Sequence, residues 1–402
     1  MSHKIVIFVG TRPEAVKMAP VVLAFRSGAC KCDVHLCSTG QHRQMLEQSL
    51  SDFNLVPDST LEVMTQGQTL AGLSSRLFAA VDGLLEIENP DAVLVQGDTT
   101  TVQVASLCAF YRGIPVGHVE AGLRTNNIRS PFPEELNRRI TTLAAAIHFA
   151  PTELARRNLI KESVEPSSIL VTGNTVVDAL LYTREAITRQ VPVLPERLEE
   201  ALAARRPLVL VTGHRRENFG GGLRSICEAL SEIAQKRPDA AVVYPVHLNP
   251  QVKEPVHRLL GGMANVYLEE PLPYRSFVRL MAASTLILTD SGGIQEEAPT
   301  FGKPVLIMRD STERPEGVLA GVNMLVGACR ESIVDHTLRI LEKGPAEKTA
   351  ELPQNPYGDG KAAGRIVGGL LHMLQNSGFR AWHPARAREA FSNQPKQPVQ
   401  LS

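Results

Sequence analysis

Short apolar runs rich in Val, Ile and Leu alternate with helix-length amphipathic stretches along almost the whole chain. The first series of runs covers residues 4–9, 33–38, 91–96 and 114–119, and the second covers residues 207–213, 240–246, 265–270, 285–290 and 303–308. Strands that alternate with helices in this way form a parallel sheet with crossover helices. The alternation therefore predicts an α/β protein with two doubly wound domains.

The break between the two series sets the expected domain organisation. We expect a first Rossmann-like domain over residues 1–172 and a second over residues 173–359. The stretch 360–378 predicts a helix long enough to cross back and complete the first domain. Residues 380–402 lose the periodicity and gain Pro, Gln and Arg, so a loose C-terminal extension is expected there.

The composition narrows the range of ligands and environments. Lys plus Arg and Asp plus Glu are equal at 42 each, whereas a surface that tracks a nucleic acid normally carries a basic excess. No apolar run is long enough to span a membrane, and the start shows no signal-peptide cleavage pattern. The six cysteines are scattered without metal-ligand spacing. We therefore expect a cytoplasmic protein with reduced thiols, no metal site, and no nucleic-acid or membrane partner.

Reactive residues follow three runs of the first series. Arg12, Asp98 and Glu120 come directly after strands, and ligands of open parallel sheets bind beyond the carboxyl ends of the strands. The competing explanation is that a polar residue after a strand caps the next helix. That explanation suits Thr99–Thr101 better than Asp98, and it does not account for Arg12 or Glu120. We expect Arg12, Asp98 and Glu120 at one edge of the first sheet.

Glu134 and Glu135 open a helix after a loop rich in proline. A glutamate in the first turn of a helix can simply favour the helix dipole. This structural interpretation is stronger for Glu135 than for Glu134, which we keep as a candidate.

The first strand-to-helix turn argues against a nicotinamide dinucleotide. Gly10 is followed by no further glycine until Gly28, so the G-x-G-x-x-G fingerprint is missing. The chain also has no Walker loop, no HExxH and no D-x-D pair. We expect no cofactor, and a bound diphosphate would be neutralised by protein cations and backbone amides.

The second series of apolar runs contains a turn whose backbone amides could neutralise a diphosphate, and we call it the nucleotide cradle. The strand over residues 285–290 is followed by Ser291, Gly292 and Gly293, and a helix N-terminus approached through glycines favours phosphate. Glu297, about a turn and a half into that helix, is expected to bind vicinal hydroxyl groups such as those of a ribose. Ser-Gly-Gly alone is weak evidence, since glycine-rich turns are common, but with Glu297 it indicates a nucleotide.

Histidines follow two other strands of the second series. His214 comes directly after one strand beside two arginines, and His247 follows the next. A lone histidine is usually structural or merely solvated. His214 is nevertheless expected to donate to a phosphate oxygen, because it faces the edge where ligands bind.

Ten motifs between about residue 4 and residue 376 match one family in order and spacing. They are GTRPEAVKMAPV, TGQHRQML, GDTTT, GHVEAGLRT, PFPEELNRR, VTGNTVVDAL, GHRREN, YPVHLNP, TDSGGIQEEAPTFGKPVL and RDSTERPEG. On these motifs the chain resembles the bacterial non-hydrolysing UDP-N-acetylglucosamine 2-epimerases. The resemblance implies a GT-B-like fold with two domains facing across a cleft, a homodimer, and a reaction that needs neither nicotinamide nor metal.

The implied function is reversible epimerisation at C2 of UDP-N-acetylglucosamine to UDP-N-acetylmannosamine, feeding bacterial surface polysaccharide synthesis. No carbonyl acidifies the C2 hydrogen, so UDP must leave before or during its removal. The intermediate would be 2-acetamidoglucal.

The resemblance also assigns roles to residues. The catalytic set is Asp98, Glu120, Glu134 and His214. The residues expected to bind substrate are Arg12, Lys17, Arg215, His247, Leu272, Phe277, Ser291, Gly292, Gly293, Glu297 and Arg314. Leu272 stands where some relatives have Gln, so only a backbone contact with uracil is expected there.

A second site is found in some members of the family, which bind an effector sugar nucleotide. Gln41, Gln44 and Arg215 match that site, but Gly67 stands where relatives have an arginine. We therefore expect any effector site to be weak.

Three alternatives remain open at the level of sequence. One is an epimerase of a modified sugar, such as a 2,3-diacetamido uronic acid derivative, which would need an extra cation. Another is a GT-B glycosyltransferase, which would share the nucleotide cradle but need an acceptor groove. The third is a sensor that binds a UDP-sugar without turnover.

Overall fold

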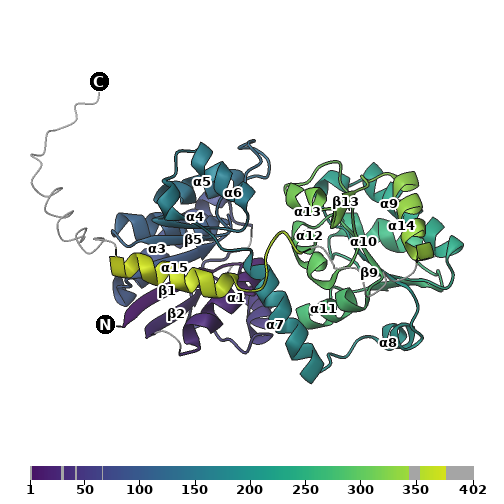
Figure 1. The fold of residues 1–402 in the computed structure, drawn as a ribbon, viewed down its shortest axis with the longest axis horizontal. Helices are drawn as coiled ribbons and strands as arrows, with labels where there is room; N and C mark the ends of the chain where they lie inside the picture. Colours follow the sequence, from purple (N-terminus) through teal and green to yellow (C-terminus); the bar gives the residue numbers. More distant parts are fainter. Residues whose placement is uncertain (1, 29–30, 41–42, 66, 344–353, 377–402) are drawn as a thin grey trace, which may run out of the picture. The chain divides into compact units, whose positions relative to one another are not determined.

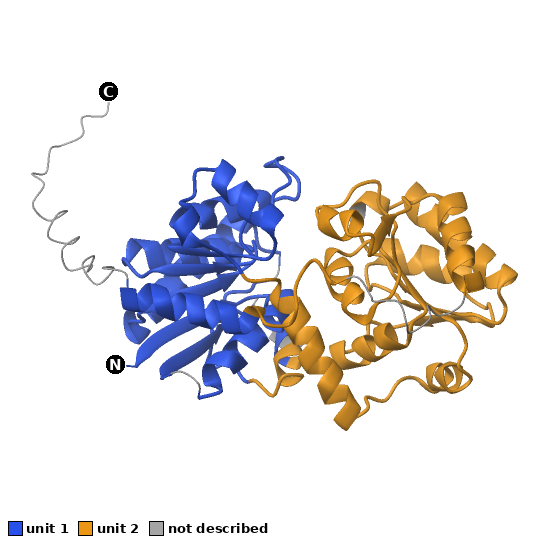
Figure 2. Cartoon of the chain, in the orientation of Figure 1, with its two compact units in different colours: residues 1–47, 56–171, 363–402 blue, residues 48–55, 172–362 orange. Residues whose placement is uncertain are grey.

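The chain divides into two compact units, each of which is described by itself (Figure 2). The computed structural model describes residues 2–28, 31–40, 43–65, 67–343 and 354–376. Unit 1 comprises residues 1–47, 56–171 and 363–402, and unit 2 comprises residues 48–55 and 172–362. The extension expected at 380–402 lies outside the described residues.

Unit 1 is built on a seven-stranded parallel sheet with the order β3-β2-β1-β4-β5-β6-β7 (Figure 1). The strands are β1 (His3–Val9), β2 (Cys32–Ser38), β3 (Ser59–Thr60), β4 (Ala92–Gln96), β5 (Val116–Val119), β6 (Ile147–Ala150) and β7 (Ile169–Val171). Its helices are α1 (Arg12–Arg26), α3 (Leu70–Glu88), α4 (Thr100–Tyr111), α5 (Glu134–Ala144), α6 (Glu153–Lys161) and α15 (Ala362–Asn376), with the 3₁₀ turn η1 (Pro166–Ser168). Helix α2 (Arg43–Ser51) runs from unit 1 into the first segment of unit 2.

Unit 2 contains a six-stranded parallel sheet with the order β10-β9-β8-β11-β12-β13. The strands are β8 (Leu208–Thr212), β9 (Ala241–Pro245), β10 (Val266–Glu269), β11 (Leu286–Thr289), β12 (Val305–Ile307) and β13 (Asn323–Leu325). The helices are α7 (Thr175–Arg189), α8 (Glu196–Ala203), α9 (Gly221–Lys236), α10 (Pro250–Leu260), α11 (Tyr274–Ala283), α12 (Gly292–Glu297), α13 (Pro315–Leu319) and α14 (Arg330–Lys343). Two 3₁₀ turns, η2 (Arg216–Asn218) and η3 (Ala298–Phe301), complete the unit.

The α/β class with two doubly wound sheets, predicted from the alternating runs, is confirmed. The strands β3, β6, β7 and β13 were not anticipated, because segments of two to four residues are too short to show a period.

Local sequence explains where several helices begin. The Thr99 side chain accepts a hydrogen bond from Val102 N and caps α4, as the capping interpretation of this segment expected. Thr69 caps α3 in the same way, and α3 ends at Asn89 in the left-handed conformation. The Thr99 cap fixes the strand-to-helix turn that carries Asp98.

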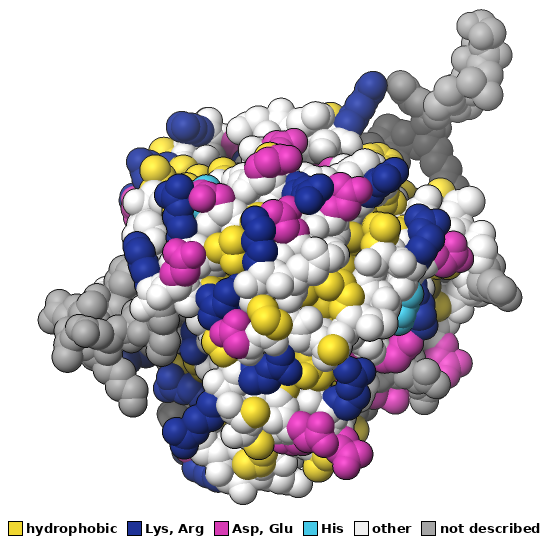
Figure 3. All heavy atoms as spheres, turned by 90° about the vertical axis from the view of Figure 1, so that its right-hand side faces the viewer, with side chains coloured by type: hydrophobic (Ala, Val, Ile, Leu, Met, Phe, Trp, Pro, Cys, Tyr) yellow, Lys and Arg dark blue, Asp and Glu magenta, His cyan; other side chains and the backbone are white. Residues whose placement is uncertain are grey.

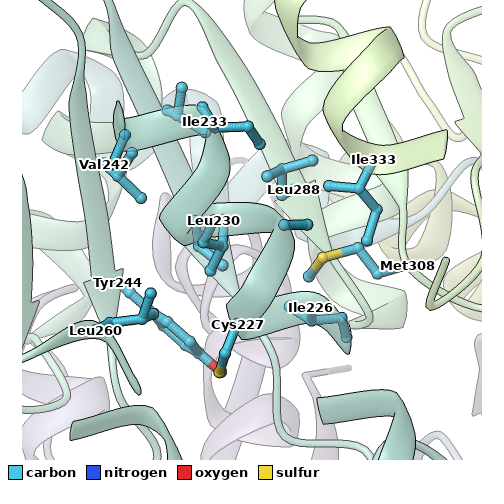
Figure 4. Close-up of a cluster of buried hydrophobic side chains, with 14 of the residues drawn as sticks. Ile226, Cys227, Leu230, Ile233, Val242, Tyr244, Leu260, Leu288, Met308 and Ile333 are labelled. Carbon is cyan, nitrogen blue, oxygen red and sulfur yellow. The ribbon is translucent and has the colours of Figure 1, made fainter. Parts of the chain in front are cut away.

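Each unit encloses its own apolar core. In unit 1, Phe8, Leu77 and Val93 are fully buried within a cluster that α3 and α4 cover. In unit 2, the apolar face of α9 packs on the sheet through Ile226, Leu230 and Ile233, as Figure 4 shows. Burial of a Leu or Ile side chain contributes about 1.5–3 kcal/mol, so these clusters hold the strand ends in place.

Helix α15 packs on the last two strands of unit 1. A Cβ placed at Gly369 would lie 2.8 Å from the Leu170 side chain on β7 and 3.1 Å from Phe149 on β6. The segment before α15 belongs to unit 2, where Tyr357 packs with Val176 and Val177 of α7.

The surface drawn in Figure 3 carries Lys and Arg side chains interspersed with Asp and Glu. The described cysteines are all free thiols; Cys37, Cys108 and Cys227 are buried, whereas Cys30 lies outside the described residues. Among the described helices, none is long and apolar enough to cross a membrane.

Candidate active site

Three neighbouring strands of unit 1 deliver the first group of candidate residues. The sheet order places β4 between β1 and β5. Arg12, Asp98 and Glu120 follow these three parallel strands, so they come together at the carboxyl edge of the sheet. This is the arrangement that the sequence predicted.

Glu120 is buried and held by two long-range partners. Its Oε2 lies 2.6 Å from Lys17 Nζ on α1 and accepts a hydrogen bond of 2.7 Å from Gln96 Nε2 at the end of β4. Only 8% of each of Lys17 and Glu120 is exposed. Charge-assisted contacts of this kind fix both the position and the orientation of a carboxylate.

The backbone at Glu120 is strained. Its φ is 64°, in the left-handed region that residues other than glycine rarely adopt. Such a conformation costs about 1–3 kcal/mol and is typical of functional sites. The strain supports a functional role for Glu120. Glu120 is not a helix cap, because no helix starts at this residue.

Asp98 is tied to α5 by its side chain and by its backbone. Arg138 donates to Asp98 Oδ2 through Nη2 and, over 3.1 Å, through Nε. Asn137 Nδ2 donates to the Asp98 carbonyl oxygen over 2.9 Å. The cation at Asp98 is therefore supplied by a helix 40 residues further along the chain.

The two glutamates that open α5 differ in their surroundings. Glu135 is fully buried and binds Arg138, Arg139 and the backbone N–H of Thr125. Glu134 is half-buried, lies one helical turn before Arg138, and its side chain has no hydrogen bond to any described residue. The contacts of Glu135 favour the structural interpretation for that residue, and Glu134 stays the candidate.

The loop that carries Arg12 is held by Glu14. Glu14 Oε2 accepts hydrogen bonds from Gly10 N at 2.5 Å and Thr11 N at 3.3 Å. The pKa of Glu14 is raised to about 7, chiefly by burial and to a smaller extent by the nearby Asp98 carboxylate, while hydrogen bonds to the carboxylate oppose the rise. Gly10 itself allows a close approach, since a Cβ there would lie 2.5 Å from Thr101 Oγ1.

The glycine turn of unit 2 lies under an arginine. Ser291 occupies the N-cap position of α12, but its side chain makes no capping hydrogen bond. A Cβ at Gly292 would lie 2.9 Å from Arg314 Cζ, so the guanidinium covers this turn. Arg314 is itself oriented by Glu296 at 2.8 Å and Glu313 at 3.1 Å. A guanidinium and a helix N-terminus at one place suit a phosphate.

The candidate nucleoside residues cluster around α11. Tyr274 donates a hydrogen bond of 3.1 Å to Glu297 Oε2. A Cβ at Gly293 would lie 3.7 Å from Glu297 Oε1, so this carboxylate borders the glycine turn. Leu272 precedes α11 and Phe277 lies one turn after Tyr274; both are half-buried. The residues expected at ribose and uracil therefore belong to one region of unit 2.

His214 lies at the end of β8 over a buried carboxylate. Asp290 Oδ2 accepts hydrogen bonds of 2.9 Å from both His214 N and Arg215 N. The His214 ring stacks on His247 with centroids 5.4 Å apart. Partial burial lowers the pKa of His214, the Asp290 carboxylate opposes this, and Arg215 and His247 add to the lowering.

Some functional partners were missed by reasoning from the sequence. Four residues each form a hydrogen bond with a candidate residue that lies 23 or more positions away in the sequence. They are Gln96, Arg138, Tyr274 and Asp290. Asn137 and Arg138 lie inside the motif PFPEELNRR, and Asp290 inside TDSGG, so the motifs were the available signal. The pairings themselves required the fold.

The residues expected at an effector site are only partly described. Gln41 lies outside the described residues, and so does the side chain of Gln44. Arg215, the third residue of the expected effector site, is half-buried with its Nε in no hydrogen bond. Among the described residues, no group of three or more His, Cys, Asp or Glu could hold a metal ion.

Together, the two parallel doubly wound sheets place the chain in the GT-B-like class, with paired carboxylates in unit 1 and an arginine over a glycine turn in unit 2. The family model described as UDP-N-acetylglucosamine 2-epimerase matches residues 26–371. The chain belongs to this family. The isomerase class expected from the motifs is thereby confirmed.

Individual relatives agree along nearly the whole chain. A probable UDP-N-acetylglucosamine 2-epimerase from Ralstonia solanacearum is 51% identical over 372 residues, 90% of this chain and 97% of the relative. The UDP-N-acetylglucosamine 2-epimerase of Escherichia coli K12 is 50% identical, with 91% and 98% covered. The crystal structure of UDP-GlcNAc 2-epimerase from Neisseria meningitidis bound to UDP-GlcNAc superposes with a TM-score of 0.83 at 45% identity, covering 92% of this chain and all of that chain.

Proposed function

We propose that this protein interconverts UDP-N-acetylglucosamine and UDP-N-acetylmannosamine by eliminating and re-adding UDP. The relative from Neisseria meningitidis is bound to UDP-GlcNAc in its crystal structure, which supports the substrate. The observation that carries the proposal is the set of unit 1 carboxylates. Asp98 and Glu120 are fixed by Arg138 and Lys17, and a nucleotide cradle alone would not need them.

The chemistry follows from the substrate. The C2 hydrogen has no adjacent carbonyl, so it becomes acidic only as the C1–O bond breaks and positive charge develops at C1. The bonding pair leaves with UDP, a carboxylate takes the C2 proton, and a C1=C2 double bond forms. Delivery of a proton to the opposite face of C2 and attack of UDP at C1 complete the inversion.

The roles divide between the two units. Asp98, Glu120 and Glu134 carry the proton transfers, a task for which a positioned carboxylate contributes about 10²–10⁴ in rate. His214 and Arg314 stabilise the departing diphosphate, with the turn at Ser291–Gly293 beneath it. Glu297 binds the ribose.

The remaining predicted contacts complete the proposal. Arg12 and Lys17 lie near the sugar and phosphates, Arg215 and His247 support the diphosphate, and Leu272 with Phe277 borders uracil. Arg12 has no hydrogen bond to a described residue, which leaves its guanidinium available to an anion.

The assembly and the biological role belong to the same proposal. By family resemblance we propose a cytoplasmic homodimer that supplies UDP-N-acetylmannosamine to surface polysaccharide synthesis. The effector site is weak, because Gly67 offers no guanidinium to a phosphate; loss of such a charge-assisted contact costs roughly 1.5–3 kcal/mol.

The test is turnover of UDP-N-acetylglucosamine in D₂O by the purified protein, with EDTA and without added NAD. We expect a mixture of the two epimers that carries deuterium at C2, because the abstracted proton exchanges before its return. Product with C2 fully protonated would contradict the elimination route. Binding without turnover would favour a sensor, and transfer to an acceptor would favour a glycosyltransferase.

A parallel incubation with a UDP-2,3-diacetamido uronic acid addresses the remaining alternative. Faster turnover of that sugar than of UDP-N-acetylglucosamine would assign the enzyme to the modified substrate. We expect the unmodified sugar nucleotide to be preferred, because the motifs resemble the epimerases that act on it.

A further inference from the structure

Asp290, the residue after β11, is a buried carboxylate beside the proposed catalytic group His214. Only 1% of it is exposed. Its Oδ2 accepts from His214 N, from Arg215 N and, at 3.3 Å, from Asn218 Nδ2. One oxygen of one buried side chain thus holds both ends of the short loop that presents His214.

The other oxygen of Asp290 faces the imidazole. Oδ1 lies 3.6 Å from His214 Nδ1, which is longer than a hydrogen bond. Oδ1 is buried and has no hydrogen-bond partner in the described structure. A buried carboxylate oxygen without a donor is costly, and catalytic hydrogen bonds often tighten only when the substrate binds.

A second hydrogen bond holds the His214 loop at Gly213. Tyr244, which is fully buried, donates a hydrogen bond of 2.8 Å to the Gly213 carbonyl oxygen. This contact fixes the backbone before His214, but the Tyr244 hydroxyl makes no hydrogen bond to the imidazole. Tyr244 therefore offers a matched control for Asp290.

We propose that Asp290 is a positioning residue for the reaction proposed above: its carboxylate orients the His214 ring through Nδ1–H and leaves Nε2 for the diphosphate of the substrate. The inference rests on the proposed function of His214 and names Asp290 as the residue that orients its ring. A carboxylate at Nδ1 fixes the tautomer of a neutral imidazole and stabilises the imidazolium. With both nitrogens protonated, Nε2 donates a charge-assisted hydrogen bond to the leaving UDP.

The charges around His214 decide in which direction its pKa moves when Asp290 is replaced. Asp290 favours the imidazolium, whereas Arg215 and His247 disfavour it. Asp290→Asn keeps the shape of the side chain, and its amide oxygen can still accept from the loop N–H groups. Its NH₂ then faces Nδ1 as a donor, so the imidazolium loses its support and the pKa of His214 falls.

The experiment compares Asp290→Asn with Tyr244→Phe in the full-length enzyme. We expect Asp290→Asn to lower kcat about 10- to 100-fold while KM changes less than about threefold. In the pH profile of kcat for Asp290→Asn, the basic limb should move to lower pH by about one unit. Tyr244→Phe should leave that limb in place.

The same shift should be visible without turnover. In enzyme labelled with ¹⁵N-histidine, the His214 signals are assigned by their loss in His214→Asn. We expect their midpoint to fall by about one pH unit in Asp290→Asn. An unchanged midpoint would overturn the proposal, whatever the effect on kcat. If the wild-type enzyme failed to epimerise its substrate, the proposed function would be wrong. The titration would still decide whether Asp290 raises the pKa of His214.

A double-mutant cycle separates positioning from folding. If Asp290 acts through the imidazole, Asp290→Asn should lower kcat by less than about threefold in a His214→Asn background. An equal loss in both backgrounds would assign Asp290 a structural role only and would overturn the proposal.

Discussion

The loops after β1 and β8 occupy equivalent places in their units and are held by the same device. Each follows the first strand of its unit, carries a candidate basic residue, and donates two consecutive backbone N–H groups to one carboxylate oxygen. The carboxylate differs in origin. Glu14 lies in the first turn of the helix that follows its loop, whereas Asp290 lies 76 residues from His214 on a neighbouring strand.

This difference has consequences for what each carboxylate can do. Glu14 closes a local capping arrangement, and burial favours its neutral form. Asp290 joins two strand ends and faces an imidazole. A local carboxylate therefore fixes a turn, while one from a neighbouring strand can also orient a side chain.

The two units also differ in the candidate groups that they present. Unit 1 presents Asp98 and Glu120, which are held by cations, whereas unit 2 presents His214 and Arg314, which are held by carboxylates. Carboxylates suit proton transfer, and cations suit a leaving diphosphate.

The largest expected effect tests this division of roles. Glu120→Gln should lower kcat about 10²–10⁴-fold, because the amide cannot exchange the C2 proton. UDP affinity should change less than about threefold, since the cradle belongs to unit 2. Steady-state kinetics and calorimetric UDP titration measure the two quantities. Near-normal turnover would remove Glu120 from the catalytic set.

The next effect concerns stability and the neutral form of Glu14. Its pKa of about 7 lies above the ordinary 4.5, so its contribution to stability is fully present below about pH 4.5 and is lost as pH rises to about 7. Glu14→Gln removes this dependence. Between pH 5 and pH 8, the free energy of unfolding of the variant should rise relative to wild type by roughly 3 kcal/mol.

Urea denaturation followed at several pH values checks this expectation. Glu153→Gln is the control, because Glu153 also lies in a first helical turn but is largely exposed. It should show no comparable change. A constant difference between Glu14→Gln and wild type over this range would mean that Glu14 is ionised throughout.

The same comparison explains what the sequence could predict. The Glu14 cap is local, and Thr11 with Glu14 has the spacing of a capping box. The alternation of runs likewise predicted β1, β4 and β5, whose order brings Asp98 and Glu120 together. Periodicity and spacing carry this information because each depends on residues near one another in the chain.

The partners of the candidate residues depended on the three-dimensional fold. Nothing in the sequence pairs Lys17 with Glu120, 103 residues away, or Asp290 with His214. The segment 48–55 gave no sign of belonging to unit 2, although its Asp52 carbonyl accepts a hydrogen bond of 3.2 Å from Arg275. Such contacts arise only when two distant segments pack.

A smaller effect is expected at the nucleoside end of unit 2. Glu297→Ala should weaken UDP binding about 10- to 100-fold, because hydrogen bonds to a charged group contribute about 1.5–3 kcal/mol. With saturating substrate, kcat should fall far less than in Glu120→Gln. Calorimetry and saturation kinetics measure these effects. The reverse pattern would show that the roles of the two units are interchanged.

The smallest effect distinguishes the ribose contact from the residue that supports it. Tyr274→Phe removes the hydrogen bond to Glu297 but keeps the ring, which packs 6.4 Å from Phe53. Loss of one such bond is worth about 1 kcal/mol, so UDP binding should weaken about fivefold. Tyr182→Phe is the matched control, because Tyr182 stacks on the same Phe53 at 5.3 Å and makes no hydrogen bond to Glu297. If both variants weakened UDP binding equally, packing around Phe53 would account for the loss. A change confined to Tyr274→Phe would show that Glu297, like His214, depends on a partner brought to it from another strand or helix.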